Sequence, residues 1–169
     1  VEFEFHAQRS PVVLDRLRSG EYMVGICTGS SDAETDLQSE VIRREPMVIL
    51  PSGLSKLRYE VGDSLDVITI ESRSGAWQSI EDDMGRLHLN RSASLESFFA
   101  VAQMALAGFG HGLVPAGVAR TLGVMPNQWI DLTEAGLTRP VRFVARKSLF
   151  SQPLVQNFYV AVAEKAADV

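Results

Sequence analysis

The sequence predicts a mixed α/β fold, and three features carry this prediction. An apolar helix expected from Leu95 to Leu106 is followed by three glycines and then by the apolar residues 113–115, as at a corner between a helix and a short strand. Strand candidates and helix candidates alternate along the chain. Small polar loops stand between several strands and the helices that follow them. The 169 residues, 46% of them hydrophobic, suffice for one sizeable core or for two small lobes.

The first elements are a strand and a helix. Residues 1–6 alternate apolar and polar side chains, which is the pattern of a strand with one buried face. Ser10 is the expected N-cap of a helix that begins at Pro11 and ends at Gly20. The inner face of this helix would carry Val13, Leu14 and Leu17.

A second strand is expected over residues 22–28, which are almost continuously apolar and so are expected to be covered on both faces. With the strand and helix before it, this strand would complete a βαβ unit. Its Cys27 is the only cysteine of the sequence, so no intrachain disulfide can form; we expect a buried thiol and a reducing compartment. Asp32, Glu34 and Asp36 alternate in the next loop, but the glycine and terminal glutamate of a calcium loop are missing, so a solvated surface is favoured.

The middle of the chain suggests a boundary between two lobes. Two extended stretches are expected within residues 37–50, broken at Pro46, and the punctuation at residues 51–53 marks the boundary. A strand over residues 67–70 is followed by a small-residue loop and by a helix expected over residues 76–84. That loop would place free backbone amides at the tip of a sheet.

A short strand over residues 87–89 and a polar loop over residues 91–94 precede the central helix, for which Ser94 is the expected N-cap. The remaining expected elements are a helix over 115–122, strands over 129–132 and 141–145, and a terminal helix that opens at residues 152–153. The stripe of the terminal helix that faces the core would be Leu154, Phe158, Ala161 and Val162. The strand over 141–145 would return the chain to the first lobe.

Charge and hydropathy argue against two classes of partner. A net charge of −5 and a pI of about 5.2 disfavour binding of nucleic acid by this segment alone, because phosphate binding needs clustered cations. No apolar run reaches the roughly 18 residues that span a bilayer, and the N-terminus lacks the pattern of a signal peptide. We therefore expect no membrane contact.

Catalytic and metal-binding patterns have little support. His6, His88 and His111 are the only histidines, none has the spacing of a metal site, and no serine lies in a G-x-S-x-G turn. Asp82 and Asp83 are adjacent on a helix and diverge, so they do not form a catalytic pair. We expect no catalytic residue, no metal and no cofactor, and of the histidines only His111, between two glycines, is a candidate for ligand contact.

Three segments resemble motifs of one family. Residues 14–26 resemble its LxxGxxDxxI segment, residues 45–51 its E-P-L-V-L-V strand, and residues 104–115 its VxxGxGxxLLP corner. The chain thereby resembles the effector-binding domain of a LysR-type transcriptional regulator over essentially all of its length. A transport solute-binding protein, which shares the fold, is the alternative, and an enzyme of the same α/β class comes third.

The resemblance implies two Rossmann-like lobes joined by two crossing strands, as in a type II periplasmic binding protein. Lobe I would comprise residues 1–50 and 145–169, and lobe II residues 51–144. The family has a helix-turn-helix DNA-binding domain, a further strand and a further helix before residue 1, and none of these is in the chain. We therefore expect a portion of a longer polypeptide, or a fragment that hides the apolar face of residues 1–5 by association.

The resemblance also implies a ligand cleft between the lobes and a homo-dimer or tetramer, with residues 115–122 near the interface. DNA would be bound only through the domain that is absent, and the protein would be cytoplasmic. Helix starts and the cations Arg9, Arg73 and Arg146 favour a small organic anion as effector, although each residue is equally explained as an ordinary cap, turn or surface residue. The candidate ligand-binding residues are Gln8, Arg9, Ser10, Thr28, Ser72, Ser74, Gly75, Ser92, Ala93, His111 and Arg146.

Overall fold

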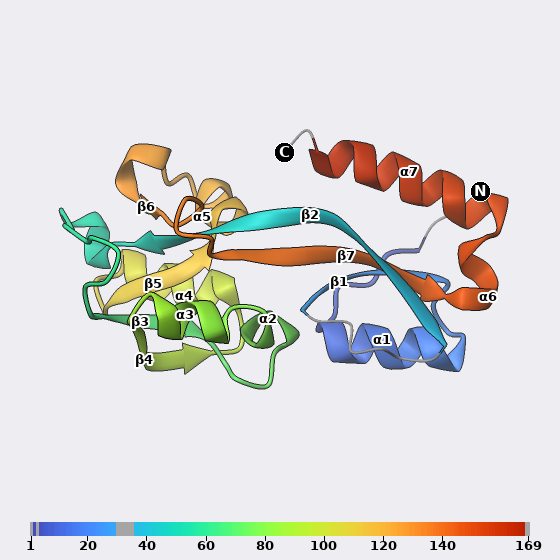
Figure 1. The fold of residues 1–169 in the computed structure, drawn as a ribbon, viewed down its shortest axis with the longest axis horizontal. Coiled ribbons are helices and arrows are strands. Elements are labelled where there is room, and N and C mark those ends of the chain that lie inside the picture. The colour runs from blue at the N-terminus through green and yellow to red at the C-terminus, as the bar shows by residue number, and fades with distance from the viewer. Residues whose placement is uncertain (1, 3, 30–35, 168–169) are drawn as a thin grey trace. The chain divides into compact units, whose positions relative to one another are not determined.

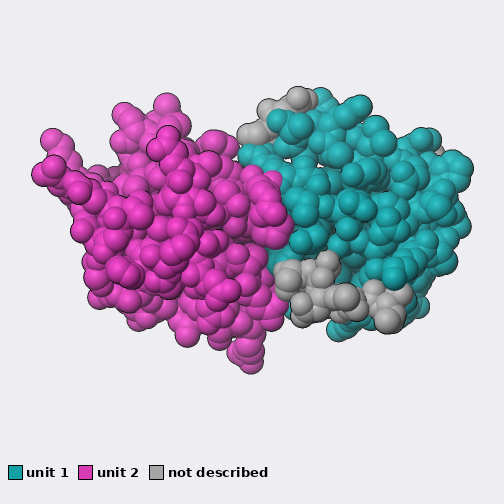
Figure 2. Space-filling view, in the orientation of Figure 1, with its two compact units in different colours: residues 1–43, 141–169 teal, residues 44–140 magenta. Residues whose placement is uncertain are grey.

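The computed structural model describes residues 2, 4–29 and 36–167, and its chain divides into two compact units (Figure 2). Unit 1 comprises Val1–Arg43 and Val141–Val169, and unit 2 comprises Arg44–Pro140. The chain passes between the units within two strands, β2 (Leu37–Leu50) and β7 (Thr138–Arg146) (Figure 1). The unit boundaries therefore lie at 43/44 and 140/141 and not at 50/51 and 144/145, because the last residues of β2 pair with strands of unit 2.

Unit 1 is a small sheet with helices on both faces. The strand β1 (Val24–Thr28) pairs antiparallel with β7 and is the last strand at one end of the described sheet. Alternate residues of β7 point to opposite faces: Val144 packs with α1 (Ser10–Ser19), and Phe143 packs with α6 (Lys147–Phe150) and α7 (Pro153–Ala167). One short apolar stretch of β7 thus supplies both cores of the unit.

The helix α1 forms as expected, and the strand before it does not. Gly20 ends α1 with a φ of 83°, a conformation that favours glycine. The described residues of the segment 1–9 have no strand structure, and Phe5 is 80% exposed; Val1 and Phe3 lie outside the described residues. Alternating polarity shows only that one face suits burial, whereas a strand also needs a neighbour that pairs with its backbone. The expected βαβ unit therefore does not form among the residues that the structure describes.

The strand β1 forms, but the prediction that both of its faces are covered is wrong. Cys27 is buried, whereas Ile26 is 52% exposed on the opposite face. The acidic residues Asp32 and Glu34 of the following loop lie outside the described residues.

The terminal helix α7 has its expected first residue but a different buried stripe. Leu154 is exposed, and Val155 packs instead with Phe143 and Phe150. Val155, Phe158 and Tyr159 follow helical spacing as well as the predicted set does, so the neighbouring strand and α6 decide which stripe is buried.

Unit 2 holds the larger core and the rest of the sheet. Its strand β3 lies between the parallel neighbours β4 and β5, and β5 pairs antiparallel with the end of β2. The strands are β3 (Leu65–Ile70), β4 (Leu89–Leu95), β5 (His111–Pro115) and β6 (Ile130–Asp131). The helices are α2 (Gly75–Gln78), α3 (Glu81–Arg86), α4 (Phe98–Leu106) and α5 (Ala116–Thr121), with 3-10 turns at Ser52–Leu54 and Pro126–Gln128.

Three expectations for unit 2 are corrected. β2 continues through Pro46 as one strand, and the helix expected over 76–84 is two helices, α2 and α3. The polar residues 91–94 form part of β4 and not a loop, because β4 pairs with β3 along its length. Ser94 therefore pairs in the sheet, and Ser97 caps α4 by accepting a hydrogen bond from the N–H of Phe99 at 3.2 Å.

The glycine-rich corner after α4 forms as the sequence predicts. Gly108 has a φ of 87°, and β5 begins three residues later. A Cβ atom on Gly112 would lie 2.9 Å from the Cβ of Ala105, so the helix and the strand approach as closely as glycine allows. This corner sets the distance between α4 and the sheet.

Candidate functional site

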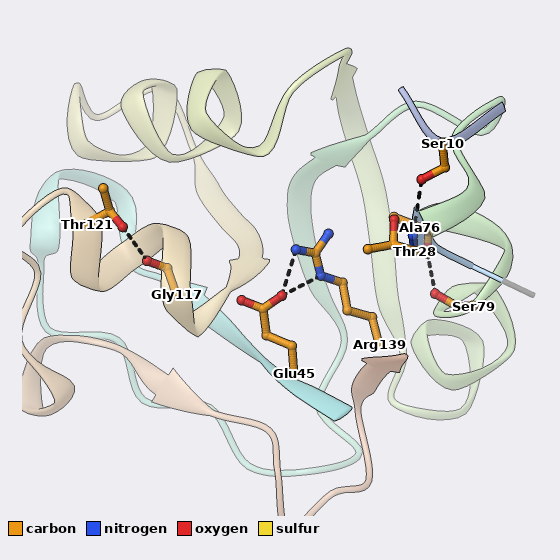
Figure 3. A network of polar contacts seen from close by, with 8 residues as sticks. All are labelled: Ser10, Thr28, Glu45, Ala76, Ser79, Gly117, Thr121 and Arg139. Atoms are coloured by element: carbon orange, nitrogen blue, oxygen red, sulfur yellow. Dashed lines mark hydrogen bonds and ion pairs between the residues drawn. The ribbon is translucent and has the colours of Figure 1, made fainter. Parts of the chain in front are cut away.

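In unit 1 the first residue of α1 meets the last residue of β1. The backbone N–H of Thr28 donates to the Oγ of Ser10 at 3.1 Å (Figure 3). Ser10 therefore is not the N-cap; that position is taken by Arg9, whose side chain makes no cap hydrogen bond. We define Ser10, Thr28 and Gly29 as the unit 1 corner.

The cation Arg142 lies at this corner and was not foreseen from the sequence. Arg142 of β7 donates from its Nε to the carbonyl oxygen of Gly29 at 3.0 Å. It arrives there because the antiparallel register places Arg142 opposite Cys27. A pairing between residues 115 positions apart leaves no local sequence signal, so only the register reveals it.

Cys27 lies beside this corner as an inert thiol. Burial raises the pKa of the Cys27 thiol to about 11, and a hydrogen bond with the Ser10 side chain partly opposes this rise. The thiol is protonated at neutral pH, and a protonated thiol is neither a nucleophile nor a metal ligand.

Arg146 lies at the opposite end of α1 and β1 from Ser10 and Thr28. Its Nη1 donates to the carbonyl oxygen of Leu17 at 3.2 Å, in the last turn of α1. In the ladder, Ala145 pairs with Val24, the first residue of β1. Arg146 thus satisfies a carbonyl at the helix C-terminus, where a cation is electrostatically favoured.

In unit 2 a second polar corner lies at the carboxyl ends of β3 and β4. The Oγ of Ser74 accepts from the N–H of Trp77 at 3.0 Å, and Gly75 begins α2. The N–H of Glu71 donates to the carbonyl oxygen of Leu95 at 3.0 Å, so the turn after β3 is bound to the end of β4. We define residues 71–75 and 94–97 as the unit 2 corner.

Three other candidate residues of unit 2 lie outside this corner. Ser92 and Ala93 are exposed residues of β4 that precede it. His111 pairs with Val67, and its Nδ1 accepts from the N–H of Ser52 at 3.0 Å. It begins β5, so it lies toward the opposite end of the sheet from Ser74.

A largely buried ion pair joins β2 to β7 inside unit 2 (Figure 3). The Nε and Nη2 of Arg139 lie 2.8 and 2.6 Å from the Oε2 of Glu45, and both side chains are only 15% exposed. The Arg139 guanidinium also lies over the ring of Phe98, 5.1 Å from its centroid. Glu45 stands within a motif singled out in the sequence, but nothing there indicated its partner.

The sequence matches the family described as the LysR substrate binding domain over residues 1–167. The chain belongs to this family. A relative described as an uncharacterized HTH-type transcriptional regulator, from Vibrio cholerae serotype O1, is 24% identical over 154 residues, which is 90% of this chain and 52% of the relative. The chain thus spans about half the length of this curated relative.

Solved structures share the fold of this LysR substrate-binding domain. The sulfate-bound mutant regulatory domain of OxyR2 from Vibrio vulnificus has a TM-score of 0.69 and 20% identity, and the match covers 95% of this chain and 78% of that one. CbnR, a LysR family transcriptional regulator, has a TM-score of 0.68 and 15% identity, with coverage of 95% and 57%. These likenesses confirm the predicted two-lobed α/β architecture of the periplasmic-binding type.

The described part of this LysR domain contains neither a metal-binding group nor a membrane-spanning helix. Within residues 2, 4–29 and 36–167 no group of three or more His, Cys, Asp or Glu side chains is arranged to hold a metal ion. In the same residues no helix is both long enough and apolar enough to cross a membrane. Predicted ligand residues come together at the two corners: Ser10 with Thr28 in unit 1, and Ser74 with Gly75 in unit 2.

Proposed function

We propose that this LysR substrate-binding domain senses a small organic anion through its two polar corners. The observation that carries the proposal is the hydrogen-bonded unit 1 corner, where the Ser10 hydroxyl, Thr28 and the Arg142 guanidinium gather at one strand end. Hydroxyl groups and guanidinium groups are effective donors to carboxylate, sulfate and phosphate. Of the predicted residues, Gln8 and Arg9 adjoin this corner in sequence, and Ser72, Ser74 and Gly75 belong to the unit 2 corner.

The bound sulfate named for the OxyR2 neighbour supports an anion as the kind of ligand. Arg73, in the unit 2 corner, is an exposed cation 3.7 Å from Glu71. His111 and Arg146 lie away from both corners, so the proposal places less weight on them.

We infer that the effector regulates transcription through a DNA-binding part that lies outside this chain. The curated relative is described as an HTH-type regulator, and full-length CbnR has been solved with its target DNA. A net charge of −5 fits a segment that does not itself hold DNA. A transport solute-binding protein shares the fold but is less favoured, because the family and the curated relative are those of regulators. We propose no catalytic activity and a cytoplasmic location.

We further propose that the protein acts as a homo-dimer or tetramer, with α5 at or near the contact. Light scattering of the intact protein measures the oligomer directly. A monomeric mass across the micromolar range contradicts this part of the proposal and leaves effector sensing open.

Thermal shift in the presence of small molecules tests the effector. Sulfate and small carboxylates should raise Tm, since a ligand at about 100 times its Kd stabilises the folded state by about 2.7 kcal/mol. Neutral sugars and amines should not. Stabilisation by neutral or cationic compounds alone contradicts the anion.

Variants then locate the site. Ser10→Ala should weaken the anion-induced shift, because it removes the hydroxyl that joins α1 to β1. Ser19→Ala is the matched control, since the Ser19 hydroxyl bonds only locally, to the carbonyl oxygen of Arg16 at the other end of α1. If the anion-induced shift in Tm is equal in the two variants, the unit 1 corner is not part of the binding site.

A further inference from the structure

We propose that Arg139, held by Glu45, is a positioning residue for the unit 2 corner. No polar atom of Arg139 needs to reach the effector for this role. Instead, its guanidinium fixes the first turn of α4, and that turn continues directly from the residues 94–97 of the corner. The consequence for effector binding rests on the function proposed above, whereas the positioning itself does not.

The Glu45 carboxylate is held from two sides. Its Oε2 accepts a hydrogen bond from the Nε of Arg139 at 2.8 Å and forms an ion pair with Nη2 at 2.6 Å. A Cβ atom on Gly117 would lie 2.6 Å from the other oxygen, Oε1, so the first turn of α5 closely abuts the carboxylate. Both side chains of the pair are largely buried. Because two nitrogens of the planar guanidinium contact the carboxylate, the pair fixes the orientation of the Arg139 side chain as well as stabilising it.

Arg139, which is held by Glu45, contacts the first residue of α4. Its guanidinium covers Phe98, the first residue of α4, which is itself buried. The adjacent Ser97 accepts from the N–H of Phe99 through Oγ at 3.2 Å and from the N–H of Val101 through its carbonyl oxygen at 3.0 Å. Loss of the Arg139 guanidinium from the face of the Phe98 ring should therefore weaken these two hydrogen bonds first.

The start of α4 is tied in turn to the turn after β3. Leu95 ends β4 and accepts from the N–H of Glu71, at the beginning of residues 71–75. A continuous set of contacts thus runs from Glu45 through Arg139 and Phe98 to the unit 2 corner. Glu45 lies on β2 and Arg139 on β7, the two strands within which the chain passes between the units. The Glu45–Arg139 pair therefore connects the conformation of the unit 2 corner to the strands β2 and β7.

Amide hydrogen exchange, followed by NMR in the intact protein, tests the positioning without any ligand. Arg139→Met removes both the ion pair and the cation over Phe98. The amides of Phe99 and Val101 should then exchange faster by on the order of tenfold or more, because breaking a buried pair is costly and the loss acts locally. Asp83→Asn is the matched control: it breaks the Arg86–Asp83 pair of the same unit, on the surface of α3, and should leave both amides unchanged.

A milder variant keeps the test valid if Arg139→Met fails to fold. Arg139→Lys retains the charge but loses the planar two-point contact, so the two amides should exchange at an intermediate rate. Unchanged exchange of Phe99 and Val101 in Arg139→Lys and Arg139→Met overturns the inference. So does an equal acceleration in Asp83→Asn, because the effect would then be general.

Sulfate serves as the probe for the link to binding. In Arg139→Lys the sulfate-induced shift in Tm should shrink, while in Asp83→Asn it should equal that of the unaltered protein. A full-sized shift in Arg139→Lys overturns the link. If the unaltered protein shows no shift with any anion, the proposed function fails, and the exchange rates alone still decide whether Arg139 positions α4.

Discussion

The strands β1 and β3 are both short and apolar, yet the two units bury them differently. β3 lies inside the sheet of unit 2, with β4 on one side and β5 on the other, and its residues from Val67 to Ile70 are almost fully buried. β1 stands at the end of the described sheet, and it buries Cys27 while Ile26 stays half exposed. Apolar composition therefore predicts that a strand forms, whereas position in the sheet decides how much stability its side chains contribute.

The largest expected difference between the two strands concerns matched truncations. Ile68→Ala in β3 should lower the free energy of unfolding by about 2–5 kcal/mol, since Ile68 is 4% exposed and its removal leaves a cavity. Ile26→Ala in β1 should cost less than about 1 kcal/mol, because half of that side chain already contacts water. Urea unfolding of both variants measures the two losses. Equal losses would mean that Ile26 is covered in the protein in solution.

A second difference concerns pH, because β1 carries the one thiol. The folded-state pKa of Cys27 is about 11, against 9.0 for an ordinary thiol. Below pH 9 the thiol is protonated in both states, so the contribution of Cys27 to stability is fully present; it is lost as pH rises from 9 towards 11, because the unfolded chain ionises first. The loss is at most about 2.7 kcal/mol.

Unfolding measured between pH 8 and pH 11 tests this dependence, with Cys27→Ala as the control that lacks the thiol. The slope of stability against pH should be steeper in the unaltered protein than in the variant. At pH 7 a thiol reagent should label Cys27 far more slowly in the folded protein than in urea. Labelling at the rate of the unfolded chain would show that the thiol is accessible and its pKa ordinary.

The smallest expected difference in stability concerns glycine-to-alanine variants at the place where each unit packs a helix on a strand. Gly112→Ala should cost about 1–3 kcal/mol, because the added methyl meets Ala105 Cβ at 2.9 Å and the backbone carbonyl oxygen of Val101 at 3.4 Å. Gly25→Ala in unit 1 should cost at least as much, because the added methyl meets Val13 Cγ1 at 2.6 Å and Leu17 Cδ1 at 3.1 Å. Both side chains are buried, and a β-branched valine in a helix has little freedom to rotate. Gly85→Ala, with nothing within 4 Å, should be neutral or slightly stabilising.

Thermal unfolding ranks the three glycine variants. The expected order of Tm, from lowest to highest, is Gly25→Ala, Gly112→Ala, Gly85→Ala. A Gly25→Ala variant clearly more stable than Gly112→Ala would contradict this order and would show that the side chains of Val13 and Leu17 move aside more easily than helix α4 does.

Local sequence determined the helices and the turns of this protein to a large extent. Proline at a helix start, glycine at a helix end and apolar spacing located α1, α4, α5 and α7, and the glycines after α4 located the corner that leads into β5. The same local features, with three motifs in order, placed the chain in its family, which the match over residues 1–167 confirms. These signals are readable because caps and turns depend on residues only a few positions apart.

Only the tertiary structure decided which residues meet. Residues 91–94 are polar enough for a loop but lie in β4 because β3 offers them a parallel partner. Residues 1–6 alternate like a strand, yet the described ones, residues 2 and 4–6, form none. The stripe of α7, the ion pair of Glu45 with Arg139 and the arrival of Arg142 at Gly29 depend likewise on strand register. Register is set by contacts between segments about 100 residues apart, whose energies depend on the neighbour and not on the residue alone, and a single sequence carries no record of those neighbours.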